Sequence, residues 1–139
     1  MKQTLKFVGR GSAFNKTEPN NCAFYKKDGI LFIIDCGEGA LEGLVKAKAF
    51  DKVKHVYQII THMHNDHVAE LGKTFAYCNQ VLGIKPNLIN SLSIDLKKLA
   101  KHGIKENKDF KRVEPIVNNY TWVNFLLVPH AKNMDSCAL

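Results

Sequence analysis

The chain has 139 residues, of which 45% are hydrophobic, and 20 lysines and arginines outnumber 13 aspartates and glutamates, for a formal net charge of +7. This length and composition predict one soluble globular domain over residues 1–139. No stretch approaches the roughly 20 apolar residues of a membrane span, and the N-terminus lacks a signal peptide's apolar segment. We therefore expect a cytoplasmic protein without membrane contact, whose positive charge weakly favours nucleotides or RNA.

The four cysteines, Cys22, Cys36, Cys78 and Cys137, are widely spaced and include no CxxC pair. This spacing predicts free thiols and argues against a disulfide framework or a zinc knuckle. Cys36 follows an aspartate and could place a thiol near a metal ion. A small buried residue is the commoner role for such a cysteine.

The first part of the chain predicts strands over residues 4–9, 21–27 and 30–35. A KKDG turn precedes the third segment, which is a continuous apolar run typical of a buried central strand. Residues 37–50 predict a helix. A second buried strand is predicted over residues 56–60.

An amphipathic helix that ends at Gly83 is predicted next, because apolar residues recur at intervals of three and four: Val68, Leu71, Phe75, Cys78 and Leu82. A short strand is predicted at residues 87–89, and a helix between Ser93 as N-cap and Gly103 as C-cap. A long strand is predicted over 120–130, and another apolar strand begins where the chain stops. Strands in one layer with helices outside them indicate an α/β sandwich.

A cluster of ionisable residues follows the strand predicted at 56–60, in the stretch IITHMHNDH. His62 and His64 are two residues apart on a non-helical segment, so both imidazoles can reach one cation. Asp66 and His67 bring more donors than one catalytic zinc takes, since such a zinc has three protein ligands and an open position for water. Chance clustering in a polar loop is the alternative, but four donors in six residues favour two metal ions.

Another histidine, His130, ends the strand predicted at 120–130 and is the candidate third ligand of the metal at His62 and His64. His55 and His102 are expected on the surface. Two close divalent ions lower the pKa of a bound water and hold the attacking and leaving oxygens of a displacement at phosphorus. The cluster therefore favours hydrolysis of a phosphodiester.

The stretch THMHNDH resembles the HxHxDH signature of the metallo-β-lactamase superfamily, and the early strands, IIDCGEG and the strand-end histidine follow in that superfamily's order. The resemblance implies an α/β fold, the αββα sandwich of that superfamily, incomplete at the C-terminus. It implies that His62, His64 and His130 hold one metal ion. Asp66 and His67 would hold the other, with Asp66 also orienting the attacking water.

By the same resemblance, Asp35 orients the metal-binding histidines without binding metal itself. The implied cofactors are two divalent metal ions, with zinc as the first choice and manganese as the second. The ligand types alone do not fix the metal, because histidine and carboxylate suit zinc, manganese and iron alike. The N-terminal stretch VGRGSAFNKTEPNNCAFY is similar to that of ribonuclease Z. The stretch VAELGKTFAYCNQVLGIKPNLI is closer to small relatives that include the anti-Pycsar phosphodiesterases, which cleave cyclic nucleotides.

The resemblance implies a phosphodiesterase that acts on cyclic nucleotides through a metal-bound hydroxide, and that forms a homodimer. One alternative is ribonuclease Z-like processing of tRNA 3′ ends. Another is a non-catalytic module, in which His62, His64 and His130 keep one metal ion and Asp66 or Cys137 completes the site.

The superfamily's bridging aspartate and final histidine cannot be assigned in this chain, because Asp135 follows His130 too closely for the bridging role. The chain therefore corresponds to the first half to two thirds of a superfamily domain. Its abrupt end in an apolar strand favours a fragment of a longer hydrolase over a naturally shortened protein.

Overall fold

The computed structural model describes the backbone of residues 4–89, 94–113, 126–131 and 134–138, and the side chains of the first two ranges. The strands are β1 (Lys6–Gly9), β2 (Cys22–Lys27), β3 (Ile30–Ile34), β4 (His55–Ile59), β5 (Asn87–Ile89), β6 (Lys111–Val113), β7 (Leu126–Ala131) and β8 (Met134–Ala138). The helices are α1 (Ala40–Lys46), α2 (Asn65–Val68), α3 (Leu71–Tyr77), the π-helix η1 (Cys78–Leu82) and α4 (Leu96–Lys101).

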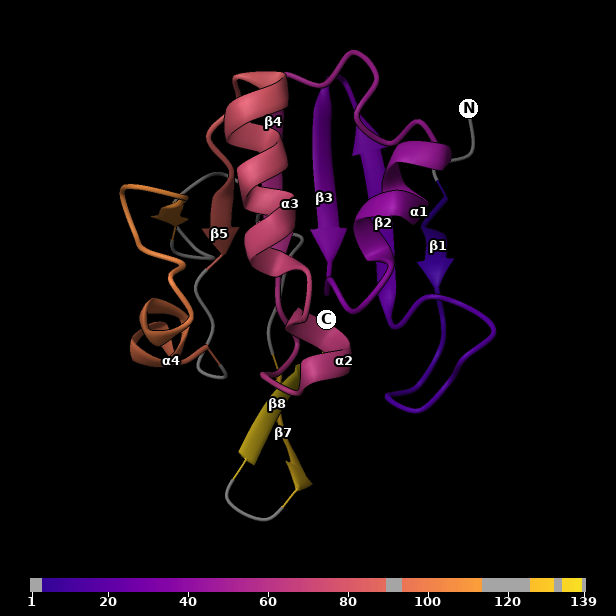
Figure 1. Cartoon of the computed structure of the whole chain (residues 1–139), viewed down its shortest axis with the longest axis vertical. Coiled ribbons are helices and arrows are strands. Elements are labelled where there is room, and N and C mark those ends of the chain that lie inside the picture. The colour runs from indigo at the N-terminus through magenta and orange to yellow at the C-terminus, as the bar shows by residue number, and fades with distance from the viewer. Residues whose placement is uncertain (1–3, 90–93, 114–125, 132–133, 139) are drawn as a thin grey trace.

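Six strands form one sheet in the order β1-β2-β3-β4-β5-β6, and β7 pairs with β8 in a separate hairpin (Figure 1). The first three strands are antiparallel, whereas β3, β4, β5 and β6 run parallel. Parallel neighbours need a crossover, which α1 supplies between β3 and β4. The ends of these two strands therefore meet at one edge, where Ile34 pairs with Ile59. The residues that follow each strand become neighbours there.

Both faces of this sheet carry apolar side chains. On one face, Leu31 and Ile33 pack with Leu44 of α1 in a buried cluster, and α1 and α3 lie in front of the strands in Figure 1. On the other face, Phe32 of β3 stacks on Tyr57 of β4, with ring centroids 5.2 Å apart. Alternate residues of each strand thus serve the two faces, as the continuous apolar run of β3 predicts.

The helix predicted over 37–50 is shorter than expected, because left-handed residues stand at both of its ends. Gly39 has a φ of 79° just before α1, and Lys48 has a φ of 55° shortly after it. A residue in that conformation cannot continue a right-handed helix. The helix predicted after the histidines ends at Gly83, whose φ of 66° is left-handed, as expected.

That second helix is not continuous but is divided into α2, α3 and η1. The break falls at Glu70, whose backbone N–H donates to Cys36 O at 3.0 Å and not to the preceding helical turn. The predicted apolar stripe is core nevertheless, since Leu71, Phe75 and Cys78 are buried.

The later elements bring two differences from the predictions. Asp95 caps α4, with its side chain accepting from the Lys98 N–H at 3.0 Å, in place of Ser93, which lies outside the described residues. Strand β6 was not predicted, because its three residues are mostly charged and exposed. β5 and the strand at the chain's end agree with the predictions. β7 agrees with the strand predicted over 120–130 from residue 126 on, and residues 120–125 lie outside the described residues. None of the described helices is long and apolar enough to cross a bilayer.

Candidate metal centre

The histidine-rich turn between β4 and α3 is fastened to the segment that follows β3. The Asp35 N–H donates to Ile59 O at 2.8 Å, and the Cys36 N–H donates to His67 O at 2.7 Å. The Glu70 N–H donates back to Cys36 O at 3.0 Å. We call these three backbone hydrogen bonds the backbone clamp. Asp35, in the segment after β3, has a φ of 58°, a conformation that Asp tolerates better than most residues.

Glycine is required beside the clamp, at Gly37. A Cβ atom there would lie 2.1 Å from Asp66 O and 2.4 Å from the Asn20 Cβ. Both distances are far below van der Waals contact, so the close approach of the two segments depends on a missing side chain. This accounts for the first glycine in the sequence IIDCGEG.

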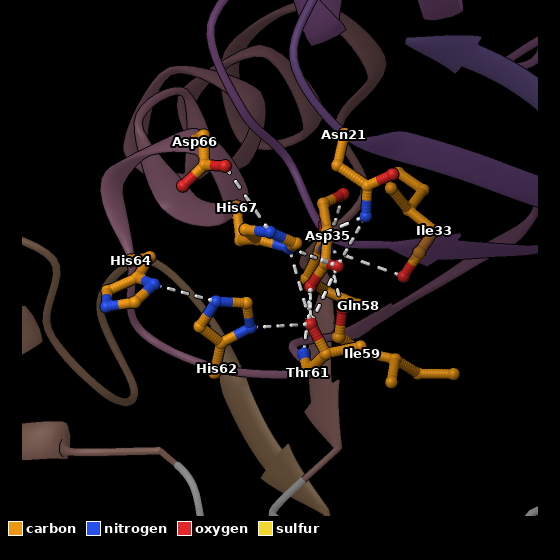
Figure 2. Close-up of polar contacts among 10 residues, drawn as sticks. All are labelled: Asn21, Ile33, Asp35, Gln58, Ile59, Thr61, His62, His64, Asp66 and His67. Atoms are coloured by element: carbon orange, nitrogen blue, oxygen red, sulfur yellow. Dashed lines mark hydrogen bonds and ion pairs between the residues drawn. The ribbon is translucent and has the colours of Figure 1, made fainter. Parts of the chain in front are cut away.

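The side chain of Asp35 lies at the centre of the polar network in Figure 2 and is fully buried. Its carboxylate accepts from Asn21 Nδ2 at 2.9 Å, and from the N–H and the hydroxyl of Thr61 at 2.8 and 2.9 Å. His67 Nδ1 lies 2.7 Å from Asp35 Oδ2. A buried carboxylate is tolerated only when it is paired and hydrogen-bonded, and these partners meet that need.

The contact with Asp35 also fixes the tautomer of His67. A carboxylate can only accept, so the proton must be on Nδ1 and the neutral ring leaves Nε2 free of hydrogen for a cation. Burial by itself lowers the pKa of His67, but the hydrogen bond and charge of Asp35, with the charge of Asp66, outweigh burial and raise it. A divalent cation would therefore compete with a proton at this ring.

The other two histidines of the turn face each other. His62 Nε2 lies 3.1 Å from His64 Nδ1, and His62 Nδ1 lies 3.2 Å from the Thr61 hydroxyl (Figure 2). A tetrahedral cation with Zn–N bonds of about 2.0–2.1 Å holds two nitrogens about 3.3 Å apart. The 3.1 Å between these two nitrogens, which are hydrogen-bonded to each other in this structure, is thus close to the separation of two ligands of one cation.

Asp66 and His67 form the second pair, with 3.6 Å between Asp66 Oδ2 and His67 Nε2. The rings of His62 and His67 are 4.0 Å apart between centroids, so the two pairs adjoin. Among the described side chains, no three His, Cys, Asp or Glu residues converge as one metal-binding set. The chemistry of the donors fits divalent cations, with additional ligands required to complete each site.

Several predicted residues lie apart from this centre or outside the described side chains. His130 belongs to β7 and Cys137 to β8, of which only the backbone is described, so their roles as metal ligands stay predictions. Cys36 is fully buried, with Sγ 3.1 Å from the Thr74 hydroxyl, and burial raises the pKa of its thiol to about 12. His55 is exposed at the start of β4, as expected.

Three polar residues of the network were not identified from the sequence. Asn21 and Thr61 bind the Asp35 carboxylate, and buried Gln58 donates from Nε2 to the Asp35 carbonyl at 3.2 Å. Thr61 directly precedes His62, and a hydroxyl beside a metal-binding motif was the available signal. Asn21 and Gln58 reach the site only through the pairing of their strands.

Comparison with known proteins gives this centre a family context. The family described as anti-Pycsar protein Apyc1 matches residues 3–136. The chain belongs to the anti-Pycsar Apyc1 family. The anti-Pycsar protein Apyc1 of Paenibacillus harenae is 33% identical over 124 residues, covering 83% of this chain and 51% of that protein. This Apyc1-family chain thus spans about half the length of that curated relative.

Two further comparisons bear on the fold and on the ribonuclease Z resemblance. The metallo-β-lactamase fold protein YhfI of Bacillus subtilis superposes with a TM-score of 0.72 at 17% identity, covering 96% of this chain and 54% of YhfI. The Apyc1-family chain therefore has the metallo-β-lactamase fold that its motif implied. A ribonuclease Z of Haloarcula marismortui is 30% identical over 69 residues, which cover 49% of this chain and 22% of that enzyme.

Proposed function

We propose that this chain is a metal-dependent phosphodiesterase whose first metal ligands lie in the histidine-rich turn, and that its substrate is a cyclic nucleotide. The orientation of the donors supports the proposal most directly. His62 Nε2 and His64 Nδ1 face each other at 3.1 Å, and Asp35 leaves His67 Nε2 available beside Asp66. Membership of the anti-Pycsar family over residues 3–136 supports the cyclic-nucleotide substrate.

In this proposal, His62 and His64 hold one divalent cation and Asp66 with His67 the other, and His130 completes the first site. Zinc is the first choice for both cations and manganese the second. Such ions supply an activated water and neutralise charge on the phosphoryl oxygens. Asp35 keeps the proton of His67 on Nδ1, and Asp66 has a second carboxylate oxygen with which to orient the attacking water.

Metal content and turnover test the proposal together. The intact chain, loaded with zinc or manganese, should bind two equivalents and hydrolyse bis-p-nitrophenyl phosphate, and His64→Ala should abolish turnover. His55→Ala is the matched control, because His55 is exposed at the start of β4, whereas the histidine-rich turn follows the end of that strand. One equivalent of metal without turnover would instead support the non-catalytic metal-binding module.

The ribonuclease Z-like alternative is kept because of the 30% identity over 69 residues to the Haloarcula marismortui enzyme. Initial rates on 3′,5′-cyclic AMP and cyclic GMP should be compared with cleavage of a precursor tRNA at its 3′ end. Faster cyclic-nucleotide hydrolysis is the expected result. Preferential cleavage of the tRNA would overturn the proposed substrate while leaving the metal chemistry intact.

A further inference from the structure

A groove of about 470 Å³ lies beside the histidine-rich turn, between α2 and α3 on one side and α4 on the other. His64 lines one part of it, so the groove adjoins the proposed metal centre. Its apolar lining includes Met63, Leu99 and Ile104, which belong to one packed hydrophobic cluster. The volume falls within the roughly 300–1,000 Å³ of pockets that bind small molecules.

The polar lining of this groove is cationic or neutral. Lys73, Lys98 and His102 line it, and no carboxylate is among the described residues that do. The ammonium of Lys73 is 2.9 Å from Glu70 Oε1 and is therefore partly neutralised. Lys98 is bonded to the Asp95 cap through its backbone N–H, and its exposed side chain takes no part in that bond. Lys98 and His102, with the side-chain amide of Asn65, are thus donors that the described lining of the groove offers to a ligand.

We propose that this groove binds the nucleoside part of the substrate, with the scissile phosphate at His62 and His64. The inference rests on the proposed function and assigns the position of the base. Apolar side chains and a thioether suit the faces of a nucleobase, whose desolvation they favour. Lys98 and His102 can donate hydrogen bonds to carbonyl oxygens and ring nitrogens at the edge of the base. The shared residue His64 joins the two parts of the binding site.

The first test uses NMR and needs neither metal nor turnover. The metal-free chain of residues 1–139, labelled at methionine, leucine and isoleucine methyls, is titrated with 5′-GMP and, separately, with ribose 5-phosphate, which lacks the base. We expect 5′-GMP to shift the methyl signals of Met63, Leu99 and Ile104, and ribose 5-phosphate to leave them in place. If none of the three methyl signals shifted, or if both ligands shifted them equally, the proposal would be overturned.

The second test replaces one cation of the groove. K98Q should raise the Kd for 5′-GMP about three- to tenfold, which corresponds to the loss of one hydrogen bond. K97Q is the control, since exposed Lys97 is on the same helix, carries the same charge and does not line the groove. Gln is as good a helix former as Lys, so both variants should fold. Equal weakening by both would indicate a general charge effect and overturn the groove assignment.

These outcomes are separable from those of the proposed function. Hydrolysis of bis-p-nitrophenyl phosphate without base-dependent methyl shifts would reject the groove and leave the phosphodiesterase intact. Base-dependent methyl shifts in a chain that binds metal but never hydrolyses a phosphodiester would reject the phosphodiesterase and leave the groove assignment intact.

Discussion

Replacing the central carboxylate by the amide of the same shape, in Asp35→Asn, tests how the histidine-rich turn is organised. Asparagine tolerates the left-handed φ of 58° at this position, so the backbone need not move. The amide oxygen can still accept the hydrogen bonds from the N–H and the hydroxyl of Thr61. The amide nitrogen then faces Asn21 Nδ2 and His67 Nδ1, two groups that donated to the carboxylate.

The magnitude follows from those contacts. Hydrogen bonds to a buried charged group are each worth about 1.5–3 kcal/mol, so D35N should lower the free energy of unfolding of the metal-free chain by about 3 kcal/mol. His67 can relieve the conflict by accepting at Nδ1, but its proton then moves to Nε2, the nitrogen proposed to bind metal. Loss of such an orienting partner typically weakens metal affinity about 10- to 100-fold.

Competition with a chromophoric zinc chelator measures the affinity, and urea unfolding with EDTA measures the stability. D28N is the matched control, because Asp28 also has a positive φ, of 52°, but is exposed in the β2–β3 turn. We expect D28N to bind zinc as the unmodified chain does. If D35N and D28N bound zinc with affinities within twofold of each other, the proposed orienting role of Asp35 would be refuted.

Three other outcomes are expected. The pKa of His67 is raised in the folded chain, so protonated His67 should stabilise the fold fully below about pH 6.5, and this contribution should be lost as the pH rises through the folded pKa. Urea unfolding of the metal-free chain at increasing pH should show this decline in the free energy of unfolding, and D35N should show a smaller decline. Cys36 should resist alkylation at pH 8 in native chain and react in guanidinium, as mapped by mass spectrometry, because burial raises its pKa to about 12. Gly37→Ala should destabilise the chain severely, whereas Gly83→Ala, with a φ of 66° and open space, should cost only about 1 kcal/mol by urea unfolding.

Local patterns were sufficient to predict most of the strands and the gathering of histidines in the turn after β4. The apolar run at 30–35 is β3 to within one residue, and the spacing of His62 and His64 placed two imidazoles where they face each other. These features depend on neighbours in sequence. The role of Asp35 came from resemblance to a family, and the hydrogen bond to His67 now gives that resemblance a physical basis.

What the sequence did not reveal depends on contacts between distant segments. The division of the long helix at Glu70 results from a backbone bond to Cys36, which no helical periodicity can register. Asn21 reaches Asp35 because β2 pairs with β3. Lys98 and His102 line a groove beside His64 only because α4 packs near α2. His102 is exposed, as expected, but its place in this groove could not be predicted from the sequence.

The backbone clamp has a consequence for how the chain could take up and release metal. Asp35, Cys36 and Glu70 hold the histidine-rich turn by peptide groups, which do not depend on an ion to stay in place. The turn is thus ordered when the chain folds, and the proposed cations would meet donor atoms that already lie close together. Under the proposed function, the chain should therefore fold without its cations, unlike a zinc finger, whose folding the metal drives. A chelator should therefore strip the ions from a chain that keeps its fold and accepts them again without denaturation.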